Sequence, residues 1–175
     1  MSLRIRSPRA LYLAPVALAA ILLVRLGYEH FGPRLIINTT GSEPRGIYWL
    51  SGATPQSIRR STLVALTVPR TFRELIEQRQ WTRPGVQLLK NIGALAGDQV
   101  CVSKGRLSIN GKAVAPVLSR DSLGRPLPQL HGCQRLAPGY FLPLSTYIPN
   151  SFDGRYMGQQ PVALIQGVAH PLWIF

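Results

Sequence analysis

The sequence predicts a mainly β domain, a compact barrel or folded sheet with one short helix, preceded by a transmembrane helix. Three observations support this prediction. An uncharged apolar run lies near the N-terminus, short strand-like segments recur at regular intervals after it, and Asn110-Gly111 marks a tight hairpin. The chain has 175 residues, which is enough for one domain with its own hydrophobic core.

The apolar run extends from Ala10 to Val24 and follows a basic stretch that contains no acidic residue. A membrane span needs about 20 residues, so the predicted anchor covers residues 10–28, with Arg25 reaching toward the membrane surface. The positive-inside rule then predicts a basic cytoplasmic segment at residues 1–9 and a periplasmic domain at residues 29–175 of a bacterial inner-membrane protein.

A cleaved secretory signal is the alternative interpretation of this segment. Ala17-Leu18-Ala19 is similar to a cleavage site, but it lies inside the apolar run, and Leu22-Leu23-Val24 follows it. We therefore expect an uncleaved anchor. Both interpretations place the rest of the chain on the far side of the membrane.

The remainder of the chain alternates between strand-like and turn-like composition. Strands are predicted at residues 46–50, 62–68, 86–92, 99–103, 106–109, 112–114, 140–144 and 161–166. Thr71 to Glu77 is the one soluble helix, with Thr71 as N-cap and Glu74 at the capping-box position. Residues 93–98 separate two strands, and residues 118–132, rich in Pro, Gly and charge, form an irregular excursion.

Cys101 and Cys133 would lie in an oxidising compartment on this topology, and an even pair without a CxxC motif favours one disulfide. It would close a loop of about 30 residues and stabilise the fold by about 3 kcal/mol. Two buried thiols are the alternative. A metal site is not expected, because two cysteines are too few and the three histidines lack metal-ligand spacing.

The net charge of +13 raises the question of a nucleic-acid partner. The arginines are scattered along the whole chain, without a basic stripe interleaved with aromatic residues and without a zinc, helix-turn-helix or RNP-type signature. Diffuse positive charge fits a location beside an anionic membrane at least as well. No nucleic-acid partner is therefore expected.

Lys90 is an unusual lysine, because it lies in the apolar segment 85–92, whereas Lys104 and Lys112 lie beside glycines in turns. Burial disfavours the charged amine and lowers the pKa of a lysine by up to several units. A buried lysine that is neutral near pH 7 can act as a general base. A surface lysine on a half-exposed strand is the alternative.

Ser42 is the candidate nucleophile, in a tight turn between Gly41 and Pro44. A serine hydroxyl loses its proton to a base as it attacks, and a turn leaves the backbone N–H free to face a developing oxyanion. Near the C-terminus, Asp153 and Arg155 can form an ion pair that orients a neighbouring amine. Taken alone, each segment is also compatible with an ordinary surface turn. A Ser-His-Asp triad is disfavoured because no G-x-S-x-G motif occurs.

The order of these motifs closely resembles that of the type I signal peptidases, and within them the TraF-like conjugative transfer peptidases. Ser-x-Pro-x-Gly-x-Tyr follows the anchor, a lysine in an apolar strand precedes Gly-Asp, an Asn-Gly hairpin comes next, and Ser-Phe-Asp-x-Arg-Tyr lies near the end. The resemblance extends from Asn38 to the C-terminus. It implies a signal-peptidase-like folded β-sheet or barrel.

The resemblance also implies roles for individual residues. Ser42 corresponds to the acylating nucleophile and Lys90 to the general base. Asp153 corresponds to the acidic residue that supports them, Thr40 to a second oxyanion donor, and Arg155 to the partner of the acidic residue. No cofactor is implied.

Three positions depart from the family pattern. Asn91 replaces the usual basic residue after the lysine, Ala96 replaces the usual proline before Gly-Asp, and Gly154 replaces the common serine. None of these changes removes a group that Ser/Lys chemistry requires. The missing serine at Gly154 leaves open how Asp153 and Lys90 are oriented.

The resemblance implies a membrane-bound serine endopeptidase that processes an exported precursor. The excursion at residues 118–132 is too short for the accessory β-domain of general signal peptidases, which favours the TraF-like branch and maturation of a conjugative pilin. Cyclisation would result if the pilin's own N-terminal amine, instead of water, intercepted the acyl-enzyme. A general signal peptidase I, a non-catalytic assembly domain of the pilus machinery and a basic protein that contacts transferred DNA are the alternatives.

Overall fold

The structure is a computed structural model that describes residues 8–31 and 35–175. The chain divides into two compact units, one before Leu35 and one from Leu35 to Phe175. Of the basic segment predicted at residues 1–9, residues 1–7 lie outside the described residues.

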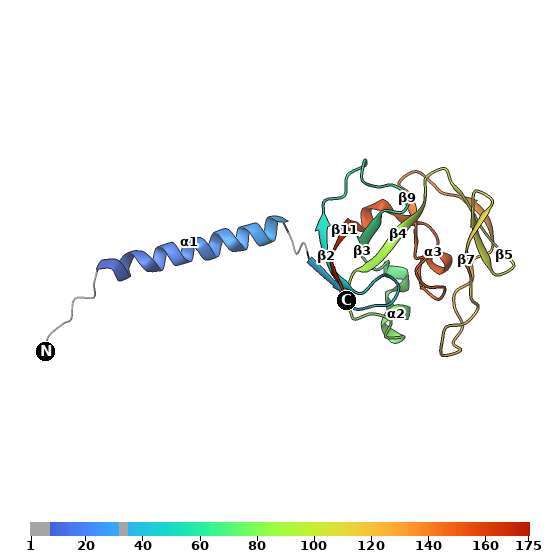
Figure 1. Ribbon diagram of the computed structural model, residues 1–175, viewed down its shortest axis with the longest axis horizontal. Helices are drawn as coiled ribbons and strands as arrows, with labels where there is room; N and C mark the ends of the chain where they lie inside the picture. The colour runs from blue at the N-terminus through green and yellow to red at the C-terminus, as the bar shows by residue number, and fades with distance from the viewer. Residues whose placement is uncertain (1–7, 32–34) are drawn as a thin grey trace. The chain divides into compact units, whose positions relative to one another are not determined.

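The helices and strands follow one another in the order shown in Figure 1. They are α1 (Pro8–Phe31), β1 (Leu35–Asn38), β2 (Gly46–Ser51), β3 (Leu63–Leu66), α2 (Arg70–Gln78), β4 (Leu88–Leu95), β5 (Gln99–Ser103), β6 (Arg106–Ile109), β7 (Lys112–Pro116), β8 (Gly132–Arg135), β9 (Tyr140–Leu144), α3 (Gly154–Met157), β10 (Gln160–Pro161), the 3-10 helix η1 (Val162–Leu164) and β11 (Ile165–Ile174).

Helix α1 includes the whole of the segment at residues 10–28. Within the part of the chain that the structure describes, no helix has both the length and the apolar character that crossing a membrane requires. The predicted transmembrane helix is thus not confirmed, although its residues are helical.

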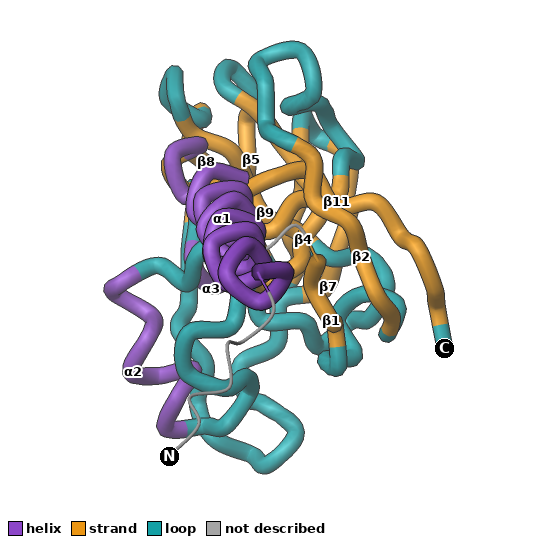
Figure 2. Tube along the Cα trace, turned by 90° about the vertical axis from the view of Figure 1, so that its left-hand side faces the viewer, coloured by secondary structure: helices purple, strands orange, loops and turns teal. Residues whose placement is uncertain are grey.

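The domain from Leu35 onward is built on two antiparallel sheets. One has the strand order β1-β2-β11-β3-β4-β9-β10, and the other has the order β7-β6-β5-β8. Figure 2 shows β2 and β11 side by side, and they pair from Gly46 to Ser51. The mainly β fold predicted from the sequence is confirmed.

Strand β4 is central to the first sheet, between β3 and β9, and leads through a short turn into β5 of the second sheet. Asp98 fixes this turn, since its carboxylate accepts hydrogen bonds from the Leu95 N–H at 2.8 Å and from Asn110 Nδ2 at 2.8 Å, and forms an ion pair with Arg60. The Gly97-Asp98 motif therefore connects the two sheets.

The hydrophobic core is divided into three clusters. The largest joins β4 and β9 of the first sheet to β5, β6 and β7 of the second. The other two lie on opposite faces of the first sheet, because Ala65 belongs to one and its neighbours Val64 and Leu66 to the other. Central strands of that sheet are consequently buried on both sides.

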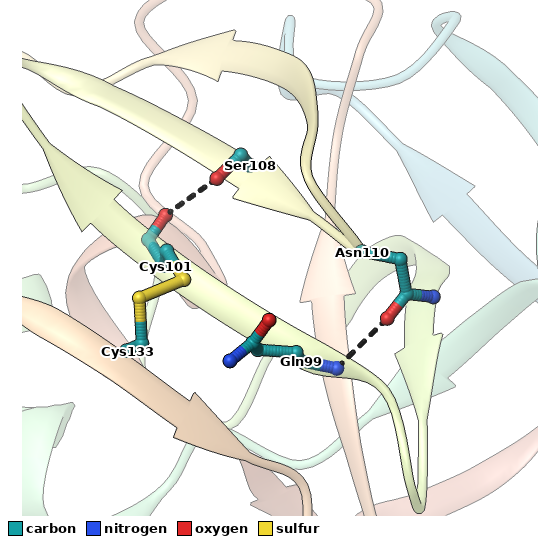
Figure 3. The surroundings of a disulfide bond; sticks show 5 residues. All are labelled: Gln99, Cys101, Ser108, Asn110 and Cys133. Carbon is teal, nitrogen blue, oxygen red and sulfur yellow. Dashed lines mark hydrogen bonds between the residues drawn. A yellow bond between two sulfur atoms is a disulfide. The ribbon is translucent and has the colours of Figure 1, made fainter.

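The hairpin at Asn110-Gly111 has the predicted geometry, with φ of 51° at Asn110 and 79° at Gly111. The disulfide prediction is also confirmed, since Cys101 of β5 is bonded to Cys133 of β8 directly opposite (Figure 3). The same view shows the Gln99 N–H donating to Asn110 Oδ1 at 2.9 Å beside the hairpin.

Helix α2 occurs where it was predicted, but its N-terminus differs. Pro69 is the N-cap residue, and no side chain caps the first turn. The predicted capping box of Thr71 and Glu74 is therefore wrong. The helix begins at Arg70, two residues earlier than a cap at Thr71 would place it. Glu74 instead accepts a hydrogen bond from Gln78 one turn later.

The strand predictions hold best in the middle of the chain. Strand β4 continues through Gly93 to Leu95, where a turn was expected, because it stays paired with β9 there. Residue 93 has no room for a side chain, since a Cβ would lie 2.7 Å from Leu144 Cβ of β9. The strand predicted at residues 161–166 is shared by β10, η1 and the start of β11. Strands β1 and β8, and most of β11, were not predicted. The prediction of one soluble helix is wrong, because α3 and η1 follow α2 in the domain.

Candidate active site

The loop that carries Ser42 connects β1 to β2 and is organised by Asn38, the last residue of β1. Asn38 Nδ2 donates to the backbone carbonyls of Glu43 and Pro44, each at 3.0 Å. Its Oδ1 accepts from the Thr40 N–H at 3.1 Å. One buried amide therefore determines the path of the loop on both sides of Ser42.

Lys90 and Ser42 meet at the centre of the first sheet. Lys90 lies on β4, its side chain is 2 % exposed, and Nζ is 2.6 Å from Ser42 Oγ. The two residues are 48 positions apart in sequence, so only the fold brings them together. This distance is within hydrogen-bond reach, as a base and its nucleophile require.

Burial lowers the pKa of Lys90 to about 8. The negative charges of Asp153 and Glu43 oppose this change, and the positive charge of Arg155 adds to it. A lysine with this pKa is partly neutral near pH 7 and can accept a proton. The surface-lysine interpretation of this position is wrong, because β4 is covered on both faces.

Asp153 and Arg155 form a fully buried ion pair. The Asp153 carboxylate caps α3 by accepting the Arg155 N–H at 3.1 Å, and it accepts Arg155 Nε at 2.9 Å and Nη2 at 2.8 Å. It also accepts the Ser145 N–H at 2.9 Å. These contacts satisfy the carboxylate, which acts on Lys90 through its charge.

Ser145 connects this ion pair to the loop that carries Ser42. It follows β9 and is fully buried, and its hydroxyl donates to the Ser42 backbone carbonyl. Arg155 Nη2 donates to the Ser145 carbonyl at 3.1 Å. Asp153 and Arg155 thus support Ser42 through Ser145.

Thr40 lies beside Ser42, and its hydroxyl donates to Asn38 Oδ1 at 2.7 Å. Donation to an oxyanion would require this hydroxyl to turn away from Asn38, so the donor role of Thr40 stays a prediction. The Ser42 backbone N–H contacts no hydrogen-bond acceptor within residues 35–175 as described. It is the better placed of the two donors.

Gly154 shows why the common serine is missing from the acidic motif. A Cβ at this position would lie 2.5 Å from the Pro143 carbonyl oxygen and 2.7 Å from Leu142 Cδ1. Helix α3 packs so closely on β9 that a serine does not fit without a backbone shift. The orientation of Asp153 comes instead from Arg155 and Ser145.

A cavity of about 220 Å³ opens onto Ser42 and Lys90. Its wall is mainly apolar and aromatic, and it includes Trp81 and Phe152, whose ring centroids are 4.6 Å apart. Ser151 also lines it, 2 % exposed, with no hydrogen-bond partner for its Oγ in the described part of the chain. The space suits an apolar segment that approaches the Ser42 hydroxyl.

Glu43, Ser145 and Ser151 are site residues that the sequence analysis did not identify. Glu43 and Ser151 lie within the two motifs, one next to Ser42 and one two residues before Asp153. An ionisable residue directly after a nucleophile could have been noticed. Ser145 carries no such signal, because only the end of β9 places it here.

No group of three or more His, Cys, Asp or Glu side chains is placed to hold a metal ion in the described ranges 8–31 and 35–175. The polar groups that line the cavity next to Ser42 are mostly hydroxyls.

Comparison with known proteins identifies the family of this chain. Residues 10–174 match the family described as signal peptidase, peptidase S26. The plasmid transfer protein TraF of Escherichia coli is 31% identical over 166 residues, which cover 88% of this chain and 89% of that protein. The conjugal transfer protein TraF of Agrobacterium fabrum is 30% identical over 148 residues, which cover 79% and 82%.

A crystal structure of a signal peptidase I from Enterococcus faecalis is similar at a TM-score of 0.40 and 23% identity, covering 67% of this chain and 98% of that one. The resemblance inferred from the motifs is confirmed by the family match and by the TraF relatives. Because the family match covers nearly the whole chain, the protein belongs to the signal peptidase family, peptidase S26.

Proposed function

We propose that this protein is a serine endopeptidase in which Ser42 and Lys90 form the catalytic dyad. The observation that carries the proposal is the 2.6 Å separation of Lys90 Nζ and Ser42 Oγ, in a buried position beside a cavity. Membership of a peptidase family supports it.

The reaction follows from the positions of these groups. Neutral Lys90 accepts the Ser42 proton while Oγ attacks the substrate carbonyl carbon, and the oxyanion faces the Ser42 N–H. The ammonium of Lys90 then donates that proton to the leaving amine as the peptide bond breaks. The resulting ester is opened by a second nucleophile, whose proton Lys90 accepts in turn.

We assign conjugation as the process in which this peptidase acts. The relatives from Escherichia coli and Agrobacterium fabrum are named plasmid transfer and conjugal transfer proteins, which supports this assignment. The substrate would be an exported pilin precursor, bound in extended conformation with small residues next to the cut. If the second nucleophile is the N-terminal amine of the pilin, the product is a ring.

Helix α1 would attach the protein to the bacterial inner membrane, with residues 1–9 in the cytoplasm and the domain in the periplasm. Its described apolar side chains, among them Leu13, Leu18 and Leu23, are exposed. The disulfide agrees with an oxidising compartment. Recovery of the full-length chain in the supernatant after alkaline carbonate extraction would contradict the membrane attachment.

Co-expression with a candidate pilin precursor, followed by mass spectrometry of the product, tests the enzymatic function. Loss of a terminal peptide shows cleavage, and a further loss of one water relative to the linear trimmed chain shows cyclisation. Ser42→Ala should abolish both, whereas Ser119→Ala, at an exposed serine, should leave both intact. Unchanged processing by Ser42→Ala would refute the proposal and favour a non-catalytic assembly domain.

A further inference from the structure

Glu43 is a buried carboxylate directly after the candidate nucleophile. We infer that Glu43 is a positioning residue for Lys90: its carboxylate fastens the Ser42 loop to β4 and stabilises the ammonium that forms when Lys90 accepts the Ser42 proton. This inference rests on the proposed dyad and extends it by one residue.

The contacts of Glu43 repeat those of Ser42 one residue further along both segments. Ser42 Oγ is 2.6 Å from Lys90 Nζ, and Glu43 Oε1 accepts from the side-chain amide of Asn91, the next residue of β4, at 3.1 Å. The Glu43 carbonyl accepts from Asn38 Nδ2 at 3.0 Å. Two consecutive loop residues thus hold two consecutive strand residues, which fixes the approach of the hydroxyl to the amine.

The burial of Glu43 makes its charge effective. The residue is 4 % exposed, and burial raises the pKa of its carboxyl, as the charge of Asp153 also does. A Ser145 hydrogen bond, the Lys90 charge and the Asn91 hydrogen bond oppose that rise. A negative charge in such surroundings acts strongly on a neighbouring amine, because little water screens it.

The other charged or titratable groups that face this pair are Asp153 and Arg155, on the loop and helix next to β9, and Tyr48 of β2. Asp153 already forms four hydrogen bonds with Arg155 and Ser145. The carboxylate of Glu43, by contrast, forms no ion pair with a cationic side chain within the described residues. Lys90 acts on it only through its charge, and Asn91 donates the hydrogen bond. Both carboxylates raise the pKa of Lys90, Asp153 more than Glu43, and Glu43 does so without an arginine partner.

Asn91 explains how this arrangement is maintained. The family usually has a basic residue after the lysine, and a cation at residue 91 would neutralise Glu43. The asparagine amide instead donates a hydrogen bond without adding charge. Asn91 therefore holds the Glu43 carboxylate without neutralising it.

Glu43→Gln tests the inference, because glutamine keeps an acceptor for Asn91 and removes the charge. The acid limb of the pH profile of kcat/KM should move to lower pH by up to about one unit, since the loss of a nearby opposite charge lowers the pKa of a lysine. The plateau should fall at least several-fold, because the ammonium is less stabilised. Glu43→Asp, which keeps the charge, should leave the acid limb at the pH seen in the unmodified protein. Glu77→Gln on α2 should change neither the pH of the acid limb nor the plateau value of kcat/KM.

A direct measurement separates this inference from the proposed function. The chain has only three lysines, so carbon-13 labelled lysine gives three NMR signals, with Lys104 and Lys112 as references. The Lys90 signal should titrate at lower pH in Glu43→Gln than in the unmodified protein, whether or not any substrate is cleaved. If Glu43→Gln does not fold, Asn91→Arg should lower the pKa of Lys90 in the same way, because the arginine would neutralise Glu43.

A Lys90 pKa that is the same in both variants as in the unmodified protein would overturn the inference. A fall in activity with an unmoved pH limb would show a merely structural role for Glu43 and would overturn it as well. Loss of the proposed function would appear differently, as processing that persists in Ser42→Ala while the Lys90 titration still moves.

Discussion

Replacing Lys90 by methionine should make the protein more stable and inactive at the same time. Methionine has a similar length and fills the buried space without a charge. The folded protein lowers the pKa of Lys90 from 10.5 to about 8, a change of about 2.5 units. At 1.36 kcal/mol per unit, holding this lysine protonated in the fold costs about 3 kcal/mol.

The pH dependence of this cost has a definite sign. Below about pH 8 both the folded and the unfolded chain carry the proton on Lys90, so the full cost is present. Between about pH 8 and 10.5 the unfolded chain binds a proton that the folded chain has lost, and the stability of the unmodified protein rises. The advantage of Lys90→Met should therefore be about 3 kcal/mol at pH 7 and should disappear near pH 10.5.

Urea unfolding of both proteins at pH 7, 9 and 10.5 measures this difference, since titrating groups away from Lys90 contribute equally to both chains. Lys112→Met, at an exposed lysine, is the matched control and should change the free energy of unfolding by less than about 0.5 kcal/mol. Equal or lower stability of Lys90→Met at pH 7, or a gain that does not vary with pH, would refute the reasoning.

Three further predictions concern other parts of the molecule. The kcat/KM for a peptide without titrating groups should rise about tenfold from pH 7 to pH 9, as the neutral fraction of Lys90 grows; a flat profile would contradict its role as base. Gly154→Ser should lower the free energy of unfolding by about 1–3 kcal/mol, because its Cβ meets the Pro143 carbonyl; an unchanged urea midpoint would argue against this close packing. Replacing Cys101 and Cys133 together by serine should cost about 3 kcal/mol and abolish the effect of reducing agents on unfolding; equal stability of the oxidised and reduced parent would count against it.

Local chemistry made several features of this fold predictable. The Asn-Gly pair requires two residues with positive φ, so the hairpin between β6 and β7 was evident from two letters of sequence. Lys90 was conspicuous because a charged side chain interrupts an apolar strand. The pairing of Cys101 and Cys133 followed from the number of cysteines and the expected compartment.

Features that depend on distant contacts were not predictable in this way. Strand β8 is exposed at all four positions and shows no alternation of apolar and polar residues. Thr40 was assigned a role by its spacing from Ser42, yet its hydroxyl donates to Asn38. Ser145 reaches Ser42 only because β9 ends beside the loop, which no local pattern encodes.

The aromatic wall of the cavity provides a built-in optical reporter. In that wall the ring centroid of Trp81 lies 4.6 Å from that of Phe152 and 5.2 Å from the Arg79 guanidinium carbon. Trp49 and Trp173 are exposed and do not line the cavity. Indole emission depends on the polarity around the ring, so displacement of water from the cavity should shift the Trp81 spectrum toward the blue. Replacing Trp49 and Trp173 by phenylalanine would leave Trp81 as the single tryptophan. Its emission would then report the binding of substrate in the cavity separately from the acylation of Ser42.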